Sequence, residues 1–198
     1  MLFETFVLGP LQTNCYLLSG DGRHAVIIDP AENGEQIAQY LEKKGLLLDA
    51  IFLTHAHYDH LGGLTLLQQR TGSPVYLHQE DLAIAPAMAY GRLQVPTLAY
   101  PDTMEAAGLS FTIYHTSGHS PGSVCIRVGD LLFTGDTLFS GSCGRIDFPG
   151  GSWEEMACSL RFLASLEGDP AIYPGHGDNS RISIECKYNP YLKEARDT

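Results

Sequence analysis

The hydrophobic residues of this chain fall into short runs with two kinds of spacing. Apolar or alternating runs of a few residues are typical of β-strands, and they occur near the N-terminus at residues 3–8, 14–19 and 25–29. Further runs of this kind follow at residues 50–53, 75–77, 109–115, 123–128, 131–133 and 171–173. The sequence therefore predicts a protein that is rich in short strands.

Apolar positions three and four residues apart predict helices between these strands. The predicted helices cover residues 37–45, 61–69 and 153–166, the last with Ser152 as its N-cap. Residues 83–98 are rich in alanine but contain Pro86 and Pro96, so we expect a helix followed by an irregular loop there. In and beyond this segment, Tyr90 and Tyr100 are candidates for the rim of a pocket.

The two halves of the chain repeat one order of elements, with strands first and helices after them. Each half can form a sheet with helices on one face, and two such sheets can bury their other faces against each other. A length of 198 residues, of which 44% are hydrophobic, suits one domain with a substantial core. We therefore expect an α/β protein whose single domain covers residues 1–198.

Charge and cysteine content limit the classes of binding partner and the cellular compartment that we expect. The formal net charge of -11, without clusters of Lys or Arg, argues against a nucleic-acid partner. No run is long enough to span a bilayer, and the N-terminus lacks the features of a leader, so we expect a cytoplasmic protein without a membrane partner. Five cysteines without paired spacing fit free thiols. The role of Cys143, in a glycine-rich segment, stays open, and nothing in the sequence predicts an oligomeric state.

The densest group of chemically active residues directly follows the apolar run 50–53. It comprises His55, His57, Asp59 and His60. Three more candidates lie beside glycines after later predicted strands: His119, Asp136 and His176. Imidazole nitrogens and carboxylate oxygens are ligands of zinc, iron and manganese, and loops at one end of neighbouring strands commonly hold functional groups. The sequence therefore predicts one metal site assembled from four loops.

The remaining histidines lack this context. We expect His24, His78 and His115 at the surface or in satisfied positions of the core rather than at the metal site. Asp29 and Thr54 are candidates for a supporting role, because a group that accepts a hydrogen bond from a ligand imidazole fixes its tautomer and raises its basicity.

The order of these residues resembles the metallo-β-lactamase superfamily, whose His-x-His-x-Asp-His pattern stands here at residues 55–60. The Val-Ile-Ile-Asp-Pro segment at residues 26–30 also matches. Residues 134–139, 144–151 and 189–192 look similar to a short bacterial branch related to glyoxalase II. The resemblance implies an αββα sandwich of two mixed β-sheets flanked by helices, with the metal site at one edge.

The resemblance also implies a division of the ligands between two divalent metal ions. One ion would be held by His55, His57 and His119, the other by Asp59, His60 and His176, with Asp136 as the bridge. The metals are expected to be zinc, with iron or manganese as alternatives. A hydroxide between them would attack a carbonyl. Asp59 and Asp136 would be the catalytic carboxylates, and Arg145 would line the substrate groove.

The reaction implied is hydrolysis of an acyl thioester such as S-lactoylglutathione, a small-molecule substrate. The chain departs from full-length glyoxalase II after His176, where we expect the helical region that binds glutathione to be missing, so the thiol carrier stays open. Asp136 stands where the commonest zinc β-lactamases have a cysteine, which disfavours that activity. The alternatives are a mononuclear iron persulfide dioxygenase that uses His57, His119 and Asp136, and a lactonase-type hydrolase.

Overall fold

The first of two facing β-sheets is built from the N-terminal half of the chain. In the computed structural model, which describes residues 1–197, it has the strand order β1-β2-β3-β4-β5. These strands are β1 Leu2–Leu8, β2 Thr13–Ser19, β3 His24–Ile28, β4 Leu47–Phe52 and β5 Val75–Tyr76. The pairs β1/β2 and β2/β3 are antiparallel, whereas β3/β4 and β4/β5 are parallel, so this sheet is mixed.

The second sheet has the strand order β13-β12-β9-β8-β7-β6. These strands are β6 Thr103–Ala106, β7 Leu109–His115, β8 Val124–Val128, β9 Leu131–Gly135, β12 Ala171–Pro174 and β13 Ser180–Arg181. Only β9 and β12 pair in parallel, so this sheet is also mixed. A small separate hairpin consists of β10 Leu138–Phe139 and β11 Ser142–Cys143.

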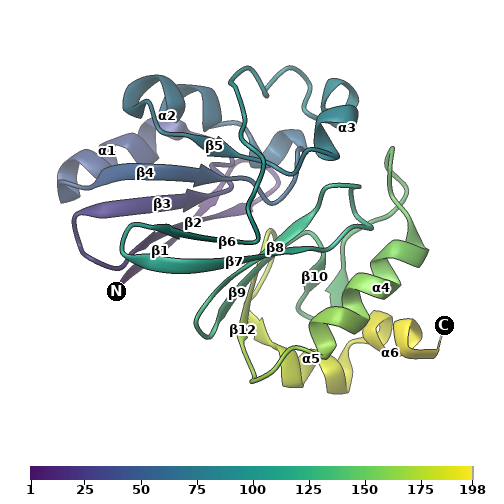
Figure 1. Cartoon of the computed structure of the whole chain (residues 1–198). Helices are drawn as coiled ribbons and strands as arrows, with labels where there is room; N and C mark the ends of the chain where they lie inside the picture. The colour runs from purple at the N-terminus through teal and green to yellow at the C-terminus, as the bar shows by residue number, and fades with distance from the viewer. Residues whose placement is uncertain (198) are drawn as a thin grey trace.

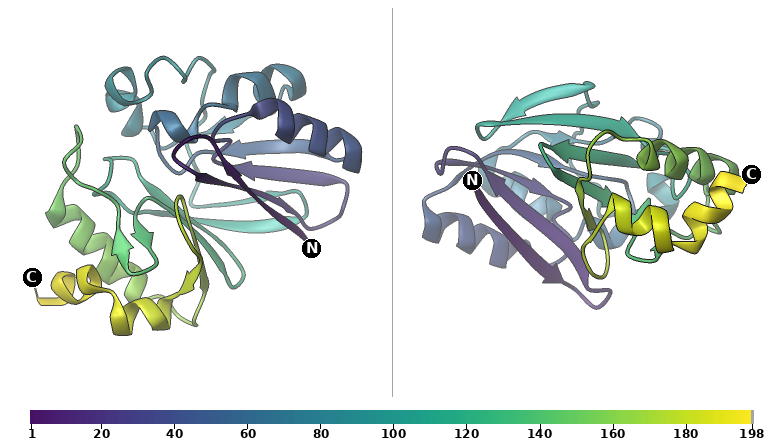
Figure 2. Two further views of the ribbon diagram at one scale, coloured as in Figure 1. Left: turned by 180° about the vertical axis from the view of Figure 1, so that it is seen from behind. Right: turned by 90° about the horizontal axis from the view of Figure 1, so that it is seen from below.

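Helices cover the outer face of each sheet (Figures 1 and 2). The first sheet carries α1 Gly34–Lys44 and α2 Leu64–Thr71, and α3 Asp81–Met88 lies at its end. The second sheet carries α4 Trp153–Ala164, α5 Ile182–Tyr188 and α6 Pro190–Asp197. The αββα sandwich of two mixed sheets is therefore confirmed. Within residues 1–197, no helix has the length and apolar character that a membrane span needs.

Strict alternation along the strands produces the layers of the core. In β2, Cys15 and Leu17 face the helices, whereas Tyr16 and Leu18 face the second sheet. This alternation follows from the period of two in a strand. Between the sheets, Phe52 and Phe111 pack edge to face with ring centroids 5.0 Å apart. Because both faces of the central strands are buried, the ends of these strands are fixed, and the loops that leave them start from rigid points.

The predictions hold for most strands and helices and miss six of them. The strands β6, β10, β11 and β13, and the helices α5 and α6, were not predicted. A strand of two to four residues shows too few positions for its alternation to be recognised. The helix expected at 61–69 begins only at Leu64, because Tyr58–His60 form a single 3-10 turn before it. At the helix 153–166, Ser152 accepts a hydrogen bond from the backbone N–H of Glu155, as an N-cap does.

Candidate metal centre

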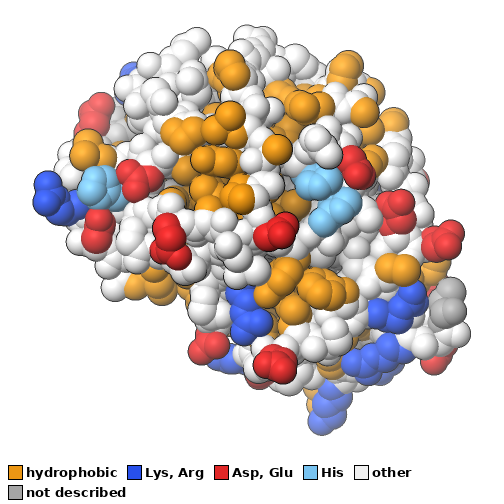
Figure 3. All heavy atoms as spheres, in the orientation of Figure 1, with side chains coloured by type: hydrophobic (Ala, Val, Ile, Leu, Met, Phe, Trp, Pro, Cys, Tyr) orange, Lys and Arg blue, Asp and Glu red, His pale blue; other side chains and the backbone are white. Residues whose placement is uncertain are grey.

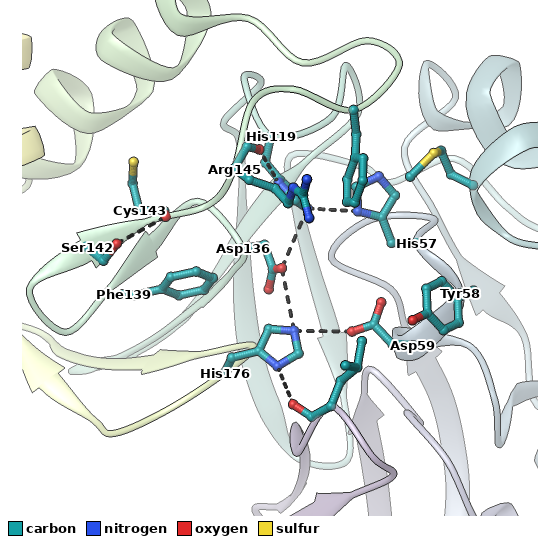
Figure 4. A pocket seen from close by; sticks show the side chains of 13 residues that line it. His57, Tyr58, Asp59, His119, Asp136, Phe139, Ser142, Cys143, Arg145 and His176 are labelled. Atoms are coloured by element: carbon teal, nitrogen blue, oxygen red, sulfur yellow. Dashed lines mark hydrogen bonds and ion pairs between the residues drawn. The ribbon is translucent and has the colours of Figure 1, made fainter.

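The seven predicted ligands meet at one edge of the sandwich, where the strand ends of both sheets converge (Figure 4). The loop after β4 brings His55, His57, Asp59 and His60. The loop between β7 and β8 brings His119, and the turns after β9 and β12 bring Asp136 and His176. The four loops of the prediction therefore do lie together, although they come from two different sheets.

One group of side chains consists of three imidazoles. The donor nitrogens of His55, His57 and His119 all lie within 4.8 Å of one another, and the three residues are buried. His119 Nε2 lies 2.8 Å from His57 Nδ1. Three imidazoles with nitrogens this close, and no acidic member among them, form a cluster of nitrogen donors of the kind that binds a metal ion.

A second group consists of Asp59, His60 and His176, whose donor atoms also lie within 4.8 Å of one another. His176 Nε2 is 3.2 Å from Asp59 Oδ2. Asp136 lies between the two groups, with Oδ1 3.4 Å from His60 Nε2 and Oδ2 3.5 Å from His119 Nε2. This arrangement agrees with the division of ligands that the resemblance implies, and the assignment of each residue to a metal stays a prediction.

The donor atoms fit metal ions because several of them have no other partner. The buried atoms His55 Nε2, His57 Nε2, His60 Nε2 and Asp136 Oδ1 make no hydrogen bond. An unpaired buried polar atom costs about 1–3 kcal/mol, and three of these residues, His55, His60 and Asp136, offer donor atoms within 4.8 Å of one another. Unpaired donors this close together indicate an absent positive charge rather than separate defects. Divalent ions satisfy nitrogen and carboxylate donors of this kind.

Burial and mutual interaction set the protonation states. Burial, reinforced by neighbouring imidazoles, lowers the pKa of His55 well below its usual range and the pKa of His57 to about 3. Burial raises the pKa of Asp59, but a hydrogen bond with His176 and the charge of His60 outweigh it and leave a value of about 2. Burial lowers the pKa of His60 and His176, but the neighbouring carboxylates outweigh it and raise both pKa values. His55 and His57 are therefore held neutral, whereas His60 and His176 hold protons that a metal ion would displace.

Asp29 holds the His60 ring from behind. Its Oδ2 lies 2.9 Å from His60 Nδ1 and accepts a hydrogen bond from Thr54 Oγ1 at 2.6 Å. Thr54 Oγ1 in turn lies 3.0 Å from His55 Nδ1. The bond to Asp29 leaves His60 Nε2 directed at the centre. Asp29 and Thr54 therefore each contact the Nδ1 atom of a predicted ligand imidazole, as expected for residues in a supporting role.

Backbone carbonyls orient two other rings. His119 Nδ1 lies 2.7 Å from the carbonyl oxygen of Arg145, and His176 Nδ1 lies 3.1 Å from the carbonyl oxygen of Leu11. A carbonyl can only accept, so in the neutral ring Nδ1 carries the proton and Nε2 keeps its lone pair for a metal. Asp59 is positioned by Thr13, whose hydroxyl donates to Oδ2 at 3.1 Å.

Asp81, which the sequence analysis missed, joins two of the loops. Its side chain is fully buried and accepts hydrogen bonds from Ala56 N at 2.6 Å, Gly122 N at 2.6 Å and Ser120 Oγ at 3.0 Å. Ala56 lies between two predicted ligands, and Ser120 follows His119. Burial raises the pKa of Asp81 despite these bonds. No local pattern marks an aspartate at the start of α3 as different from an ordinary helix-start residue.

Two glycines are required by close packing. A Cβ on Gly175 would lie 2.2 Å from Asp136 Oδ1 and 2.7 Å from His60 Cε1. A Cβ on Gly118 would lie 2.4 Å from the Met156 backbone, and its φ of +136° is one that other residues rarely adopt. The glycines beside His176 and His119 therefore allow these loops to pack against the rest of the centre.

An open cavity of about 520 Å³ lies in front of the metal-ligand candidates. Its walls are largely apolar and include Leu11, Tyr58, Met88, Phe139, Cys143 and Phe148, with Arg145 as the cation. The Arg145 guanidinium lies over the Phe148 ring and binds Asp147 at 2.6 and 2.7 Å. The prediction of Tyr100 at the rim is wrong, because its partly buried ring packs against Phe52 and does not line the cavity. Tyr90 reaches the site only through Tyr58, at 5.2 Å between ring centroids.

Residues 8–176 match the family model of the metallo-beta-lactamase superfamily, and the chain belongs to this family. It is 37% identical to the probable metallo-hydrolase YqgX of Bacillus subtilis, over 97% of this chain and 98% of that protein. It is 34% identical to the hydroxyacylglutathione hydrolase GloC of Haemophilus influenzae, over 97% of this chain and 98% of that protein. Family and centre together define a metal-dependent hydrolase fold.

Solved structures agree with this chain in fold. A di-iron form of TTHA1623 matches with a TM-score of 0.85 and 38% identity, over 95% of this chain and 99% of that one. The B3 metallo-beta-lactamase BLEG-1 matches with a TM-score of 0.85 and 34% identity, over 96% and 99%. ETHE1 from Myxococcus xanthus matches with 0.79 and 28% identity, over 100% and 91%. The fold alone therefore does not define the reaction, which depends on the residues of the metal centre and its cavity.

Proposed function

We propose that this chain is a binuclear thioesterase that hydrolyses small hydroxyacyl thioesters of the S-lactoylglutathione type. The observation that carries the proposal is the placement of Asp136 between two complete donor groups. Its Oδ1 lies 3.4 Å from His60 Nε2, and its Oδ2 lies 3.5 Å from His119 Nε2 and 3.6 Å from His176 Nε2, so the carboxylate contacts both groups. A carboxylate in this position suits a bridge between two ions. The likeness to the hydroxyacylglutathione hydrolase GloC supports the same reaction class.

Two divalent ions at this centre, zinc in our proposal with iron or manganese as alternatives, would lower the pKa of a water molecule and polarise a substrate carbonyl. Of the chain's own residues, Asp59 is placed to accept a proton or a hydrogen bond at the centre, because it remains ionised and Thr13 fixes its orientation. His176 completes the second donor group and also lines the open cavity.

The chain supplies no better nucleophile from the pocket wall. Cys143 is the one thiol among the lining residues, and burial, reinforced by the charge of Glu194, raises the pKa of its thiol to about 11. A thiol with this pKa is almost fully protonated at neutral pH, and the thiolate is the reactive form. Attack by water activated at the centre is therefore favoured over a covalent acyl-enzyme.

The pocket suits a small acyl group and binds the thiol carrier loosely. Its apolar walls accommodate an acyl chain, and Arg145 is the group for a negative charge on the substrate. Because Asp147 already pairs with Arg145, this charge is partly neutralised. All lining residues precede residue 177, so in our proposal the acyl group is the part of the substrate that these walls recognise. The Michaelis constant should therefore depend little on which thiol carries the lactoyl group.

The proposal is tested by thiol release from S-lactoylglutathione. We expect purified protein to release free thiol at a rate that falls by about a hundredfold or more in His57→Ala, because the loss of a ligand removes metal catalysis. His24→Ala is the matched control, since His24 pairs with Asp21 at the surface, and it should retain the wild-type rate. Wild-type protein that holds two metal equivalents and releases no thiol from any lactoyl thioester would contradict the proposal.

A second candidate is a mononuclear iron persulfide dioxygenase. The observation that favours it is the compact set of His57, His119 and Asp136, in which His119 Nε2 lies 2.8 Å from His57 and 3.5 Å from Asp136. The likeness to the ETHE1 structure agrees with it. Oxygen uptake with a glutathione persulfide separates the candidates, because the hydrolase consumes no oxygen. A lactone and a β-lactam in the same panel test the remaining hydrolytic activities.

A further inference from the structure

A second group of metal-binding side chains lies on the surface, away from the cavity. The rings of His78 and His115 are stacked, with centroids 4.1 Å apart and an interplanar angle of 18°. Together with the carboxylate of Glu80, they offer donor atoms that all lie within 4.8 Å of one another. Figure 3 shows two histidine side chains together beside an acidic one on this face. His78 and His115 were expected to have no metal-related role.

We propose that His78, Glu80 and His115 form an accessory site for a divalent cation, with zinc as the ion that suits it best. Two imidazoles and one carboxylate are a common set of three protein ligands for zinc, and water completes the tetrahedron. The site is exposed, with 40% of the His115 side chain and 53% of the Glu80 side chain accessible. It should therefore bind more weakly than the buried centre and exchange its ion freely.

The hydrogen bonds of His115 prepare it as a ligand. Its Nε2 lies 2.7 Å from the carbonyl oxygen of Pro121 and 4.0 Å from Glu80 Oε2, so the Glu80 carboxylate must shift towards Nδ1 when an ion binds there. Since the carbonyl only accepts, the neutral ring carries its proton on Nε2 and keeps a lone pair on Nδ1. An imidazole whose second nitrogen donates to a backbone carbonyl is the usual arrangement of a histidine that binds a metal. For His78, the competing contact is a long one, 3.4 Å from the Glu80 N–H.

The stacked arrangement of the two imidazole rings must change when an ion binds. Nearly parallel rings direct their lone pairs side by side, so one ring must rotate for both to meet at an ion. The torsion that turns an imidazole about its Cβ–Cγ bond has broad minima, and the side chains are partly exposed. The ion would replace the ring stack with two coordinate bonds and would neutralise Glu80.

The position of the site gives the ion a structural effect on the main centre. His78 and Glu80 directly precede α3, which begins at Asp81, whereas His115 ends β7 before the loop of His119. These are two of the segments that Asp81 joins through Ser120 and Gly122. A bound ion would add a second link between the same segments, at the surface side of Asp81.

Equilibrium dialysis against zinc, followed by elemental analysis of the protein, tests the proposal. We expect wild-type protein to bind one equivalent more than Glu80→Gln and His115→Gln at a zinc concentration that fills the accessory site. Each substitution should weaken this equivalent by about tenfold or more. His24→Gln is the control, because His24 and Asp21 form a surface pair without a third donor. The comparison between variants does not depend on how many ions fill the main centre.

Ring signals in the NMR spectrum provide the second measurement. Added zinc should shift the ring signals of His78 and His115 in protein whose main centre is already loaded, and should leave those of His24 unchanged. Glu80→Gln keeps the fold, since the Glu80 side chain is exposed, so a negative result cannot be attributed to misfolding. Equal zinc stoichiometry in wild type and Glu80→Gln, with unshifted His78 and His115 signals, would overturn the proposal.

Discussion

The Asp29 carboxylate lies 2.9 Å from Nδ1 of the His60 ring and holds it with Nε2 directed at the centre. Both side chains are buried, with 2% and 0% of their surface accessible. Asp29 also has a positive φ of 50°, a conformation that few non-glycine residues adopt. The backbone strain at Asp29 is therefore balanced by the contacts of its carboxylate.

This relationship predicts the result of Asp29→Asn. An amide accepts a hydrogen bond less strongly than a carboxylate and adds no charge, so His60 becomes a weaker ligand. We expect the affinity for the second metal to fall by about 10–100-fold, measured by competition with a metal-binding dye. Asp49→Asn is the control, because its carboxylate bonds the backbone of Ala107 far from the centre. Unchanged metal affinity in Asp29→Asn would refute this role.

Asp81 predicts a large effect on stability. Asp81→Ala leaves the N–H groups of Ala56 and Gly122 and the hydroxyl of Ser120 without their acceptor, which costs about 2–5 kcal/mol of the free energy of unfolding. Denaturant titration of both proteins in the same metal-loaded state measures the difference. Glu105→Ala, on an exposed position of β6, should change stability by less than about 0.5 kcal/mol. An equal loss of unfolding free energy in both variants would show that the hydrogen bonds of Asp81 do not stabilise the two loops.

Gly175 and Gly177 form a matched pair in one loop. Gly175→Ala places a methyl group against Asp136 and His60, so we expect it to abolish binding of at least one metal. Gly177 has a φ of +75° and no atom near its added Cβ, so Gly177→Ala should cost about 1 kcal/mol in stability and keep both metals. Elemental analysis of the two folded variants distinguishes these effects. Full metal content in Gly175→Ala would contradict the packing argument.

The Cys143 thiol predicts a pH dependence of labelling. Its pKa of about 11 means that the protonated, unreactive thiol is present at all pH values well below 11, and that the thiolate forms as the pH rises through that value. We expect iodoacetamide to modify exposed Cys158 at pH 7.5 and to leave Cys143 intact, as peptide mass analysis would show. Activity of Cys143→Ala should stay within a few-fold of wild type. Rapid labelling of Cys143 at pH 7.5 would contradict this assignment.

The sequence was informative about the centre because its ligands lie in short local patterns. The three histidines and one aspartate at residues 55–60, and the glycines beside His119, Asp136 and His176, are visible without knowledge of the fold. The long strands were predictable for the same reason, since each appears in the sequence as a local run of mostly apolar residues.

The rest depended on contacts between distant parts of the chain. Asp81 accepts hydrogen bonds from residues 25 and 41 positions away, which no local pattern reveals. Asn189 was recognised only as part of a family segment, yet its side chain donates to Ser142 O and ties the pocket hairpin β10–β11 to α6. Tyr100 was misplaced because its hydroxyl and ring contacts lie across the sheet, at Leu53 and Phe52.

The most direct test of the central claim is the metal content per chain, measured on protein purified without chelators and alongside thiol release from S-lactoylglutathione. We predict two metal equivalents in wild type at zinc levels too low for the surface site, with thiol release and no oxygen uptake. We also predict loss of one equivalent in His176→Ala. One iron per chain, with no thiol release and with oxygen uptake on a persulfide, would contradict the binuclear thioesterase.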